Sequence, residues 1–345
     1  MVRRLLFALV GFAPVVVLLH YIVKPSETLE FVLAAAALIP LAWLIGEATE
    51  HAAEHTGPGI GGFLNATFGN APELIIALFA VNAMDFEVVR GSLTGSVVGN
   101  LLLVLGFSLL FGGAGEIDRQ SSYLSIGLVA LTTLLLLVSS VPGWHGDPER
   151  DYLVNLSIPV SVVLLIVYLG LTWYSLRRHA ALHMPGDGES SGWSLRFALV
   201  VLGLATVITA LVAEILVGSI NTFATDSGVS EFFLAAVVIA IVGNAAEHGG
   251  AVVVAYRGKI KLATEIALSS SAQVAVFLIP AVALLALLIE PLALALREVE
   301  IAALAVSVVI ASVLLADGRS SRLKGAIMIL AYVGVAIGFY AAGDR

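Results

Sequence analysis

The stretch Gly69-Asn70-Ala71-Pro72-Glu73 lies inside a long apolar segment, and a second copy, Gly243-Asn244-Ala245-Ala246-Glu247, lies inside another. A carboxylate costs about 2.5 to 3.5 kcal/mol at the centre of a membrane helix, so glutamates there are rare and mark function. Small residues and Asn also serve as packing contacts between membrane helices. Duplication of the motif at matched depth favours an ion pathway over packing alone.

The composition identifies a polytopic membrane protein. Hydrophobic residues make up 59% of the 345 residues, charged residues 12%, and the mean hydropathy is +1.03. A soluble domain of this composition would expose far too much apolar surface to water. Cysteine is absent, which excludes disulfides, iron–sulfur sites and thiolate chemistry and leaves oxygen or imidazole as metal ligands. We expect no cofactor and no nucleic-acid partner.

Apolar runs long enough to cross about 30 Å of hydrocarbon predict an all-α fold of about eleven transmembrane helices. They cover residues 5–24, 29–53, 60–83, 91–112, 122–142, 152–175, 196–219, 232–256, 262–289, 299–316 and 325–341.

A polar stretch rich in Pro, Gly and Ser divides the chain into two comparable halves. The predicted domains are an N-terminal helix (1–28), a five-helix repeat (29–176), a cytoplasmic linker (177–193) and a second five-helix repeat (194–345). Aligning the two motifs pairs the third span with the eighth. Because each half has an odd number of spans, the second copy enters the membrane upside down, as in the inverted repeats of transporters.

The distribution of Lys and Arg predicts the orientation. With the N-terminus in the cytoplasm, the inside loops carry 12 basic residues and the outside loops carry 5, namely Lys24, Arg90, Arg150, Arg297 and Arg345. Acidic residues, among them Glu87, Glu149 and Glu300, fall outside as well. That face would attract cations, although ordinary solvated loops have the same composition. The short loops are typical of a prokaryotic plasma membrane protein.

The motif itself suits a hard cation. Asn70 and Glu73, like Asn244 and Glu247, are three residues apart and would share one helix face. Pro72 would remove a hydrogen bond inside the helix and free a backbone carbonyl about one turn back.

An amide follows each motif at nearly the same distance. Asn100 lies 30 residues after Asn70, and Gln273 lies 29 residues after Asn244. Each half therefore offers a carboxylate helix followed by an amide helix. Such oxygen ligands suit Ca²⁺, whereas Mg²⁺ would keep more of its water.

Further acidic residues predict a path for protons or cations. One face of the second span is a polar stripe of Glu47, Glu50, His51, Glu54 and His55, and Glu214 lies at a depth comparable to that of Glu47. No Lys or Arg lies deep enough to neutralise these carboxylates. Burial and mutual repulsion favour their protonated forms, so protons are the available neutralisers. Competition between Ca²⁺ and protons for Glu73 and Glu247 would give obligatory exchange.

The sequence His51-Ala52-Ala53-Glu54-His55 also matches the H-x-x-E-H pattern of inverted zinc peptidases. Such a short match has a high risk of being accidental, a zinc peptidase needs a third ligand, and the second half has no counterpart. An intramembrane zinc metallopeptidase is therefore the less favoured alternative.

The paired motifs Gly-Asn-Ala-Pro-Glu and Gly-Asn-Ala-Ala-Glu-His resemble the repeats of the Ca²⁺/H⁺ exchanger branch of the cation/Ca²⁺ exchanger superfamily. The resemblance covers the whole chain and implies that Glu73 and Glu247 bind Ca²⁺ alternately with H⁺. It implies that Asn70, Asn244, Asn100 and Gln273 shape the site, that Glu47 and Glu214 assist cation or proton passage, and that His248 stands beside the site. It also implies alternating access, by sliding of the first two helices of each half.

Two other transport modes stay open. Na⁺/Ca²⁺ exchangers of the same fold usually have Ser or Thr before the glutamate, where this chain has Asn70 and Asn244. A passive cation channel would conduct without a counter-ion gradient. Family members with an acidic linker helix differ from this chain, whose linker has only Asp187 and Glu189.

Overall fold

The computed structural model describes residues 7, 9–180 and 192–344, which are helical apart from connecting segments and two short strands. The first half contains α2 (Phe12–Leu18), η1 (Leu19–Val23), α3 (Glu27–Phe68), α4 (Ala71–Asn82), α5 (Phe86–Val98), η2 (Gly99–Val104), α6 (Leu105–Gly112), β1 (Gly115–Glu116), α7 (Arg119–Gly143) and α8 (Asp151–Ala180). The second half contains α9 (Leu195–Ser227), α10 (Glu231–Phe233), η3 (Leu234–Ile239), α11 (Ala240–Gly243), α12 (Ala245–Tyr256), α13 (Ile260–Gln273), η4 (Val274–Leu278), α14 (Ile279–Ala286), α15 (Glu298–Leu314), β2 (Arg319–Ser320) and α16 (Arg322–Ala342). Segments marked η are π-helical.

The predicted all-helical membrane fold is confirmed, but the count of eleven spans is not. Within the described residues, seven helices are long and apolar enough to cross a membrane, or eight if a bent pair counts as one span. The predicted gap between residues 53 and 60 is absent, because α3 continues to Phe68. The predicted first and tenth spans correspond to shorter helices, α2 with η1 and the 17-residue α15. Helix α8 extends to Ala180, past the predicted start of the linker at residue 177, while residues 181–191 lie outside the described part.

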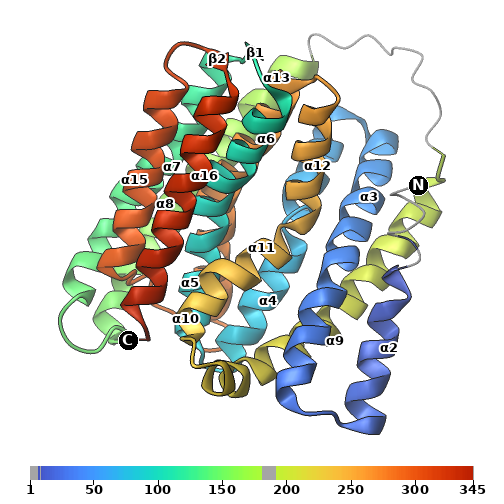
Figure 1. The fold of residues 1–345 in the computed structure, drawn as a ribbon, viewed down its shortest axis with the longest axis vertical. Helices are drawn as coiled ribbons and strands as arrows, with labels where there is room; N and C mark the ends of the chain where they lie inside the picture. Colours follow the sequence, from blue (N-terminus) through green and yellow to red (C-terminus); the bar gives the residue numbers. More distant parts are fainter. Residues whose placement is uncertain (1–6, 8, 181–191, 345) are drawn as a thin grey trace.

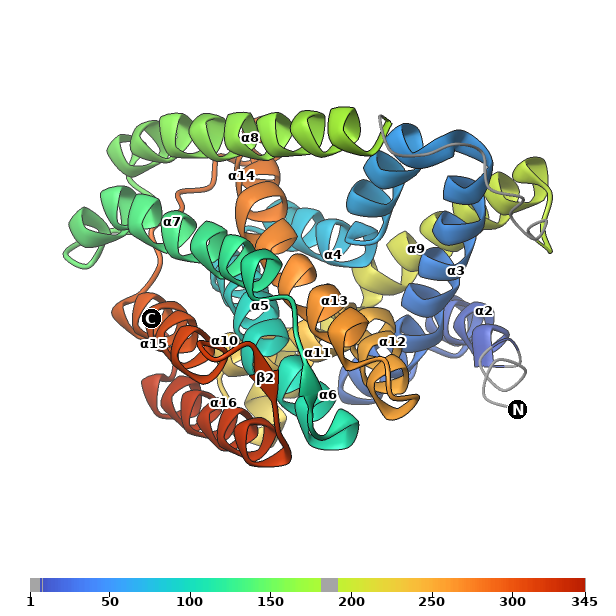
Figure 2. The ribbon, with the colours of Figure 1, turned by 90° about the horizontal axis from the view of Figure 1, so that it is seen from above.

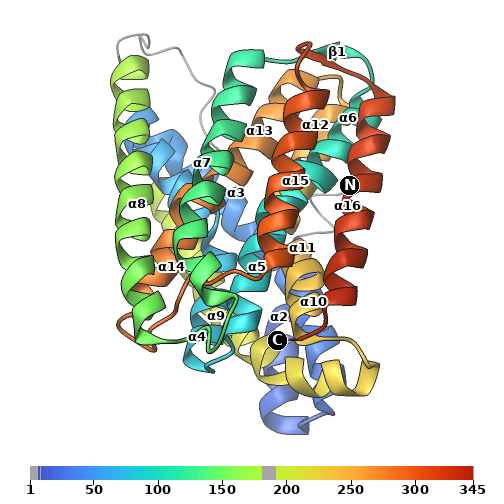
Figure 3. The same ribbon diagram turned by 90° about the vertical axis from the view of Figure 1, so that its left-hand side faces the viewer.

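The helices form two groups. Figure 1 shows α2, α3 and α9 standing together on one side of the bundle, with α6, α15 and α16 on the other. Seen from above in Figure 2, α4, α5, α12 and α13 occupy the middle. Helices α2, α3 and α9 lie on one side of them, and α7, α8, α15 and α16 lie around the other side. Figure 3 shows α8 at one margin of the bundle beside α7. We call the end where α8 stops and α9 begins the linker face, and the end with Asp85 and Ser230 the opposite face.

The two longest helices, α3 and α9, pack against each other along their length. At the opposite face their ends are joined by hydrogen bonds from Thr28 to Asp226 and from Thr222 to Glu27. Phe31 stacks on Phe223 nearby, with ring centroids 4.4 Å apart. These contacts make α3 and α9 one unit beside the central helices.

Between α14 and α15 the chain is irregular, and its second part, Leu292–Leu296, is buried. Its backbone polar groups are satisfied by side chains of α7 and α8: Ser139 donates to the Leu294 carbonyl (Oγ–O 2.7 Å), the Leu294 N–H donates to Ser157 (2.8 Å), and Trp144 donates to the Leu296 carbonyl (3.0 Å). Non-helical backbone is tolerated at membrane depth where protein groups satisfy it in this way.

Glycines bring α5 close to η3 in the second half. A Cβ built on Gly95 would lie 2.0 Å from the Ala236 carbonyl oxygen, and one on Gly91 would lie 3.1 Å from the Phe232 ring. No side chain fits at Gly95 unless the two helices separate. This contact holds the segment before Asn100 against the segment before Asn244.

Gly95→Ala is expected to destabilise the folded protein by about 1 to 3 kcal/mol, the usual cost of overpacking, and to lower the melting temperature in detergent. The matched control is Gly127→Ala on α7, where a Cβ would meet no heavy atom within 4 Å. Equal melting temperatures for the two variants would contradict the close approach.

Candidate ion-binding site

Each motif marks a break in a helix. Asn70 is the N-cap of α4, with φ −97° and ψ 16°, and Asn244 is the N-cap of α12, with φ −88° and ψ 11°. The second break bends the chain by 59° between Glu231–Gly243 and Glu247–Tyr256. Each glutamate therefore lies in the first turn of a new helix, where the helix dipole favours negative charge.

The structure corrects the predicted role of Pro72. This residue lies at the start of α4, where its missing N–H has no partner to lose, and not inside a continuous helix. The second motif breaks equally well with Ala246 in place of proline. Both breaks follow a Gly-Asn pair, and the Asn244 side chain donates to the Ala240 carbonyl (Nδ2–O 2.9 Å), which helps to end α11.

The predicted amides meet across the two halves. Asn100 donates to Asn244 (Nδ2–Oδ1 3.2 Å), and Asn70 donates to Gln273 over a longer 3.5 Å (Nδ2–Oε1). Asn70, Asn100 and Asn244 are all essentially inaccessible to solvent. The pairing of each motif with the amide helix of the other half gives a centre with approximate two-fold character.

The two carboxylates reach this centre from opposite sides. A Cβ built on Gly243 would lie 3.1 Å from Glu73 Cγ, so the glycine admits the Glu73 side chain of the other half. Glu247 is hydrogen-bonded by the Ser270 hydroxyl, and its charge is close enough to repel that of Glu73. Glu73 is 7% exposed, whereas Glu247 is partly exposed.

Several buried acceptor oxygens in this centre have no hydrogen-bond partner. They are Glu73 Oε2, Asn100 Oδ1 and Glu247 Oε2. Neither carboxylate forms an ion pair within the described part of the chain. Unpaired buried acceptors cost free energy, so this arrangement suits a cation or protons as an additional partner.

The amide residues stand where regular helix gives way to π-helix. Segment η2 begins at Gly99, beside Asn100, and η4 begins directly after Gln273. A π-helical turn adds one residue to the local turn and re-aims the side chains around it, and such turns are frequent at functional sites. The matching positions in the two halves support a shared role.

Sequence reasoning missed two hydroxyls in this centre. Asn244 donates to Ser96 (Nδ2–Oγ 2.8 Å), and Ser270 donates to Glu247. Both serines lie about one turn before an amide, Asn100 or Gln273, on the same helix. That spacing is a signal that could have identified them.

The predicted polar stripe exists on α3. His51 Nε2 lies 3.4 Å from Glu47 Oε1, and His51 Nδ1 lies 3.4 Å from Glu54 Oε2. Glu50 is exposed on the same helix. Trp193, the last residue of the predicted linker, stacks on the His51 ring with centroids 4.8 Å apart.

Two predicted path residues do not join the central hydrogen bonds. Glu214 is exposed midway along α9 and makes no hydrogen bond to the described central residues. His248 follows Glu247 on α12, and its Nε2 is buried without a hydrogen-bond partner. The fold therefore brings together all six predicted cation-site residues, whereas Glu214 and His248 form none of the hydrogen bonds among them.

The arrangement does not support the zinc peptidase alternative. In the described residues no three His, Asp or Glu side chains converge to hold a metal ion. His55 Nε2 is instead 2.7 Å from the Trp193 carbonyl oxygen, where it acts as the donor.

Two N-cap aspartates outside the spans have opposite electrostatics. Asp85 caps α5 through the Val88 N–H (3.3 Å), and burial, with the nearby Glu231 charge, raises the pKa of Asp85 from 3.8 to about 7. Asp118 caps α7, and the Ser121 N–H, together with Lys261, lowers the pKa of Asp118.

The two caps predict opposite pH dependence of stability. Because the pKa of Asp85 is raised in the folded protein, the folded state binds a proton that the unfolded chain releases. Its contribution to the free energy of unfolding is therefore present at low pH and is lost as pH rises from about 4 to about 7. Asp118 instead stabilises above its unfolded pKa, and its contribution is lost as pH falls below it. In melting curves recorded from pH 2 to pH 8, Asp85→Asn should flatten the decline between about pH 4 and pH 7. Asp118→Asn should lower the melting temperature at every pH above about 4 and approach the original protein at lower pH. Identical profiles for both variants would contradict the assignment.

Comparison with known proteins identifies the family of this chain. The sodium/calcium exchanger protein family model matches residues 26–177 and 197–341. The chain is 37% identical to the Ca²⁺/H⁺ antiporter ChaA of Bacillus subtilis, covering 94% of each chain, and 34% identical to a Ca²⁺/H⁺ antiporter of Aphanothece halophytica, covering 98% of this chain and 96% of that one. The solved structure of native YfkE superposes with a TM-score of 0.84 at 32% identity, covering 97% of this chain and 99% of that one. The chain belongs to the sodium/calcium exchanger protein family, within its Ca²⁺/H⁺ exchanger branch, whose members are secondary transporters and not enzymes.

Proposed function

We propose that this protein moves Ca²⁺ across a membrane in exchange for H⁺, with Glu73 and Glu247 binding either the cation or protons. The observation that carries the proposal is the set of buried, unpartnered oxygens of Glu73, Asn100 and Glu247, contributed by both halves of the chain. Carboxylate and amide oxygens are the ligands that Ca²⁺ prefers. The names of the relatives, which are Ca²⁺/H⁺ antiporters, give independent support.

Charge balance favours protons as the counter-ion. Two carboxylates that repel each other in a buried centre need neutralisation when Ca²⁺ leaves, and neither forms an ion pair in the described residues. Protons on the same oxygens would supply it. Asn70, Asn244 and Gln273 would orient the carboxylates, and the α3 stripe of Glu47, Glu50 and His51 would connect the site to the linker face. Glu214 on α9 would assist the passage of protons or cations.

The proposal includes an alternating-access cycle between two inverted repeats, residues 29–176 and 194–345. The first two predicted spans of each repeat, 29–53 with 60–83 and 196–219 with 232–256, would slide against the remaining helices. We place the linker face and the N-terminus in the cytoplasm and the C-terminus outside, in a prokaryotic plasma membrane, on the excess of Lys and Arg in the linker-side loops.

The test is ⁴⁵Ca²⁺ uptake into proteoliposomes with an imposed pH gradient, measured with and without Na⁺. The proposal expects uptake that follows the pH gradient and does not require Na⁺. Uptake that requires Na⁺ would establish the sodium-coupled alternative. Uptake that continues without any counter-ion gradient would identify a passive channel.

A further inference from the structure

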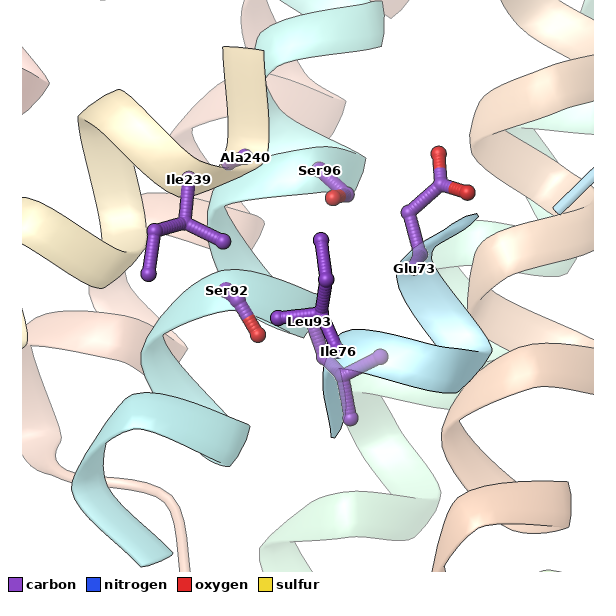
Figure 4. A pocket seen from close by; sticks show the side chains of 7 residues that line it. All are labelled: Glu73, Ile76, Ser92, Leu93, Ser96, Ile239 and Ala240. Atoms are coloured by element: carbon purple, nitrogen blue, oxygen red, sulfur yellow. The ribbon is translucent and has the colours of Figure 1, made fainter. Parts of the chain in front are cut away.

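A small pocket adjoins Glu73 on the side away from the linker face. Figure 4 shows the Glu73 carboxylate at one edge, with Ser96, Ser92, Leu93, Ile76 and Ile239 around the pocket. Ile76 and Leu93 are almost fully buried, with exposed fractions of 1% and 3%. The pocket is thus polar next to the site and apolar beyond it.

The chain direction places this pocket between the site and the opposite face. Ile76 lies one turn beyond Glu73 toward the end of α4 at Asn82. Ser92 and Leu93 lie on α5, before Asn100. Ile239 is the last residue of η3 and lies before Asn244. All these elements begin or end at the opposite face. The pocket therefore lies between Glu73 and that face, and its apolar side chains separate the two.

The same positions in the other half are different. Aligning Asn70 with Asn244 pairs Ile76 with Gly250, and aligning Asn100 with Gln273 pairs Ser92 with Glu265. Gly250 is exposed, and a Cβ built on it would meet no heavy atom within 4 Å. Glu265 and Glu247 are both only partly buried. Where one half has a buried isoleucine and a serine, the other has an exposed glycine and a carboxylate.

The difference has a physical consequence for a hydrated cation. Apolar side chains that close a narrow route exclude water and so exclude ions, since no group there replaces the hydration shell. A glycine leaves room for water, and a carboxylate attracts the cation. The two sides of the site therefore differ in sequence as well as in packing.

We propose that Ile76 is the gate on the route from the opposite face to Glu73, and that Gly250 keeps the route from the linker face to Glu247 open, with Glu265 as a carboxylate along it. The inference rests on the proposed function, because it assigns the access routes of the same site. It makes Ile76 and Gly250 the residues that set which face the resting protein opens to.

The chain has no cysteine, so single cysteines can report water access directly. We would label Gly250→Cys and Ala240→Cys in proteoliposomes with a charged, membrane-impermeant thiol reagent. Ala240 lines the pocket through a small, 3% exposed side chain. Asp187→Cys in the linker and Asp147→Cys in the α7–α8 loop define the two sides.

Gly250→Cys is expected to react from the linker side about tenfold or more faster than Ala240→Cys reacts from either side. Adding Ile76→Gly to Ala240→Cys is expected to raise its labelling from the opposite side by about tenfold. The matched control is Ile75→Gly, which shortens the neighbouring isoleucine that does not line the pocket.

A Gly250→Cys that is unreactive from the linker side, or an equal effect of Ile75→Gly and Ile76→Gly, would overturn the inference. Labelling needs no transport, so the two proposals fail separately. The labelling pattern without pH-driven Ca²⁺ uptake would leave the routes intact and reject the exchange function. pH-driven Ca²⁺ uptake without this labelling pattern would support the exchange function and reject the proposed routes.

Discussion

Glu73→Gln and Glu247→Gln are each expected to reduce pH-driven ⁴⁵Ca²⁺ uptake by about 100-fold or more. Gln keeps the size of the side chain and an acceptor oxygen, so packing against Gly243 and the Ser270 hydrogen bond can persist. What is lost is one negative charge a few ångströms from a divalent cation. Even at the effective dielectric constant of a protein surface, such a charge interacts by about 4 kcal/mol at 4 Å.

The control for these variants is Glu298→Gln, an exposed carboxylate at the start of α15. It should transport like the original protein. The variants should also lose Ca²⁺-dependent proton movement, followed with a pH-sensitive dye inside the liposomes. Loss of Ca²⁺ uptake with retained proton movement would mean that protons use other groups, and normal uptake by either variant would remove that residue from the site.

The meeting of these amide and carboxylate residues at the centre of the fold was largely predictable because the motif is duplicated. Two copies of one motif, each followed by an amide at almost the same distance, identified Asn70, Glu73, Asn100 and their counterparts without any structure. An inverted repeat makes equal depths in the two halves meet at the centre, so spacing alone indicates proximity. The hydrogen bond from Asn100 to Asn244 is the result.

Other features depend on partners that the sequence does not indicate. Apolar periodicity continues through the helix breaks at the two motifs. The sequence therefore did not predict that α4 begins at Ala71 or that α11 ends at Gly243. Arg90 and Glu300 were assigned to outer loops, yet they are 2% and 0% exposed. Besides neighbours three residues away, Arg90 pairs with Glu149 and Glu300 accepts a hydrogen bond from Thr94, both more than 50 residues away, and only the fold brings these segments together.

Arg90→Met is expected to lower the free energy of unfolding by about 3 to 5 kcal/mol, the cost of removing one partner from a buried ion pair. Arg90 Nη1 is 2.5 Å from Glu149 Oε1, and Nη2 is 3.4 Å from Glu87 Oε1. Arg90 also donates to the Ala293 carbonyl (Nη1–O 3.3 Å). Met fills much of the same volume, so the loss is electrostatic. Arg319→Met, at the exposed residue of β2, is the control, with little change expected in the melting temperature.

The origin of this cost can be separated from simple loss of packing. If stranded carboxylates cause it, then Glu149→Gln added to Arg90→Met should recover part of the lost stability, a positive coupling in a double-mutant cycle. Acid should act in the same direction, because protonation neutralises carboxylates that have lost their cation. The stability gap between Arg90→Met and the original protein should therefore narrow as pH falls from 7 toward 4. A gap that stays constant with pH, together with strictly additive single and double variants, would show that Arg90 stabilises the α5 region by packing and not by charge.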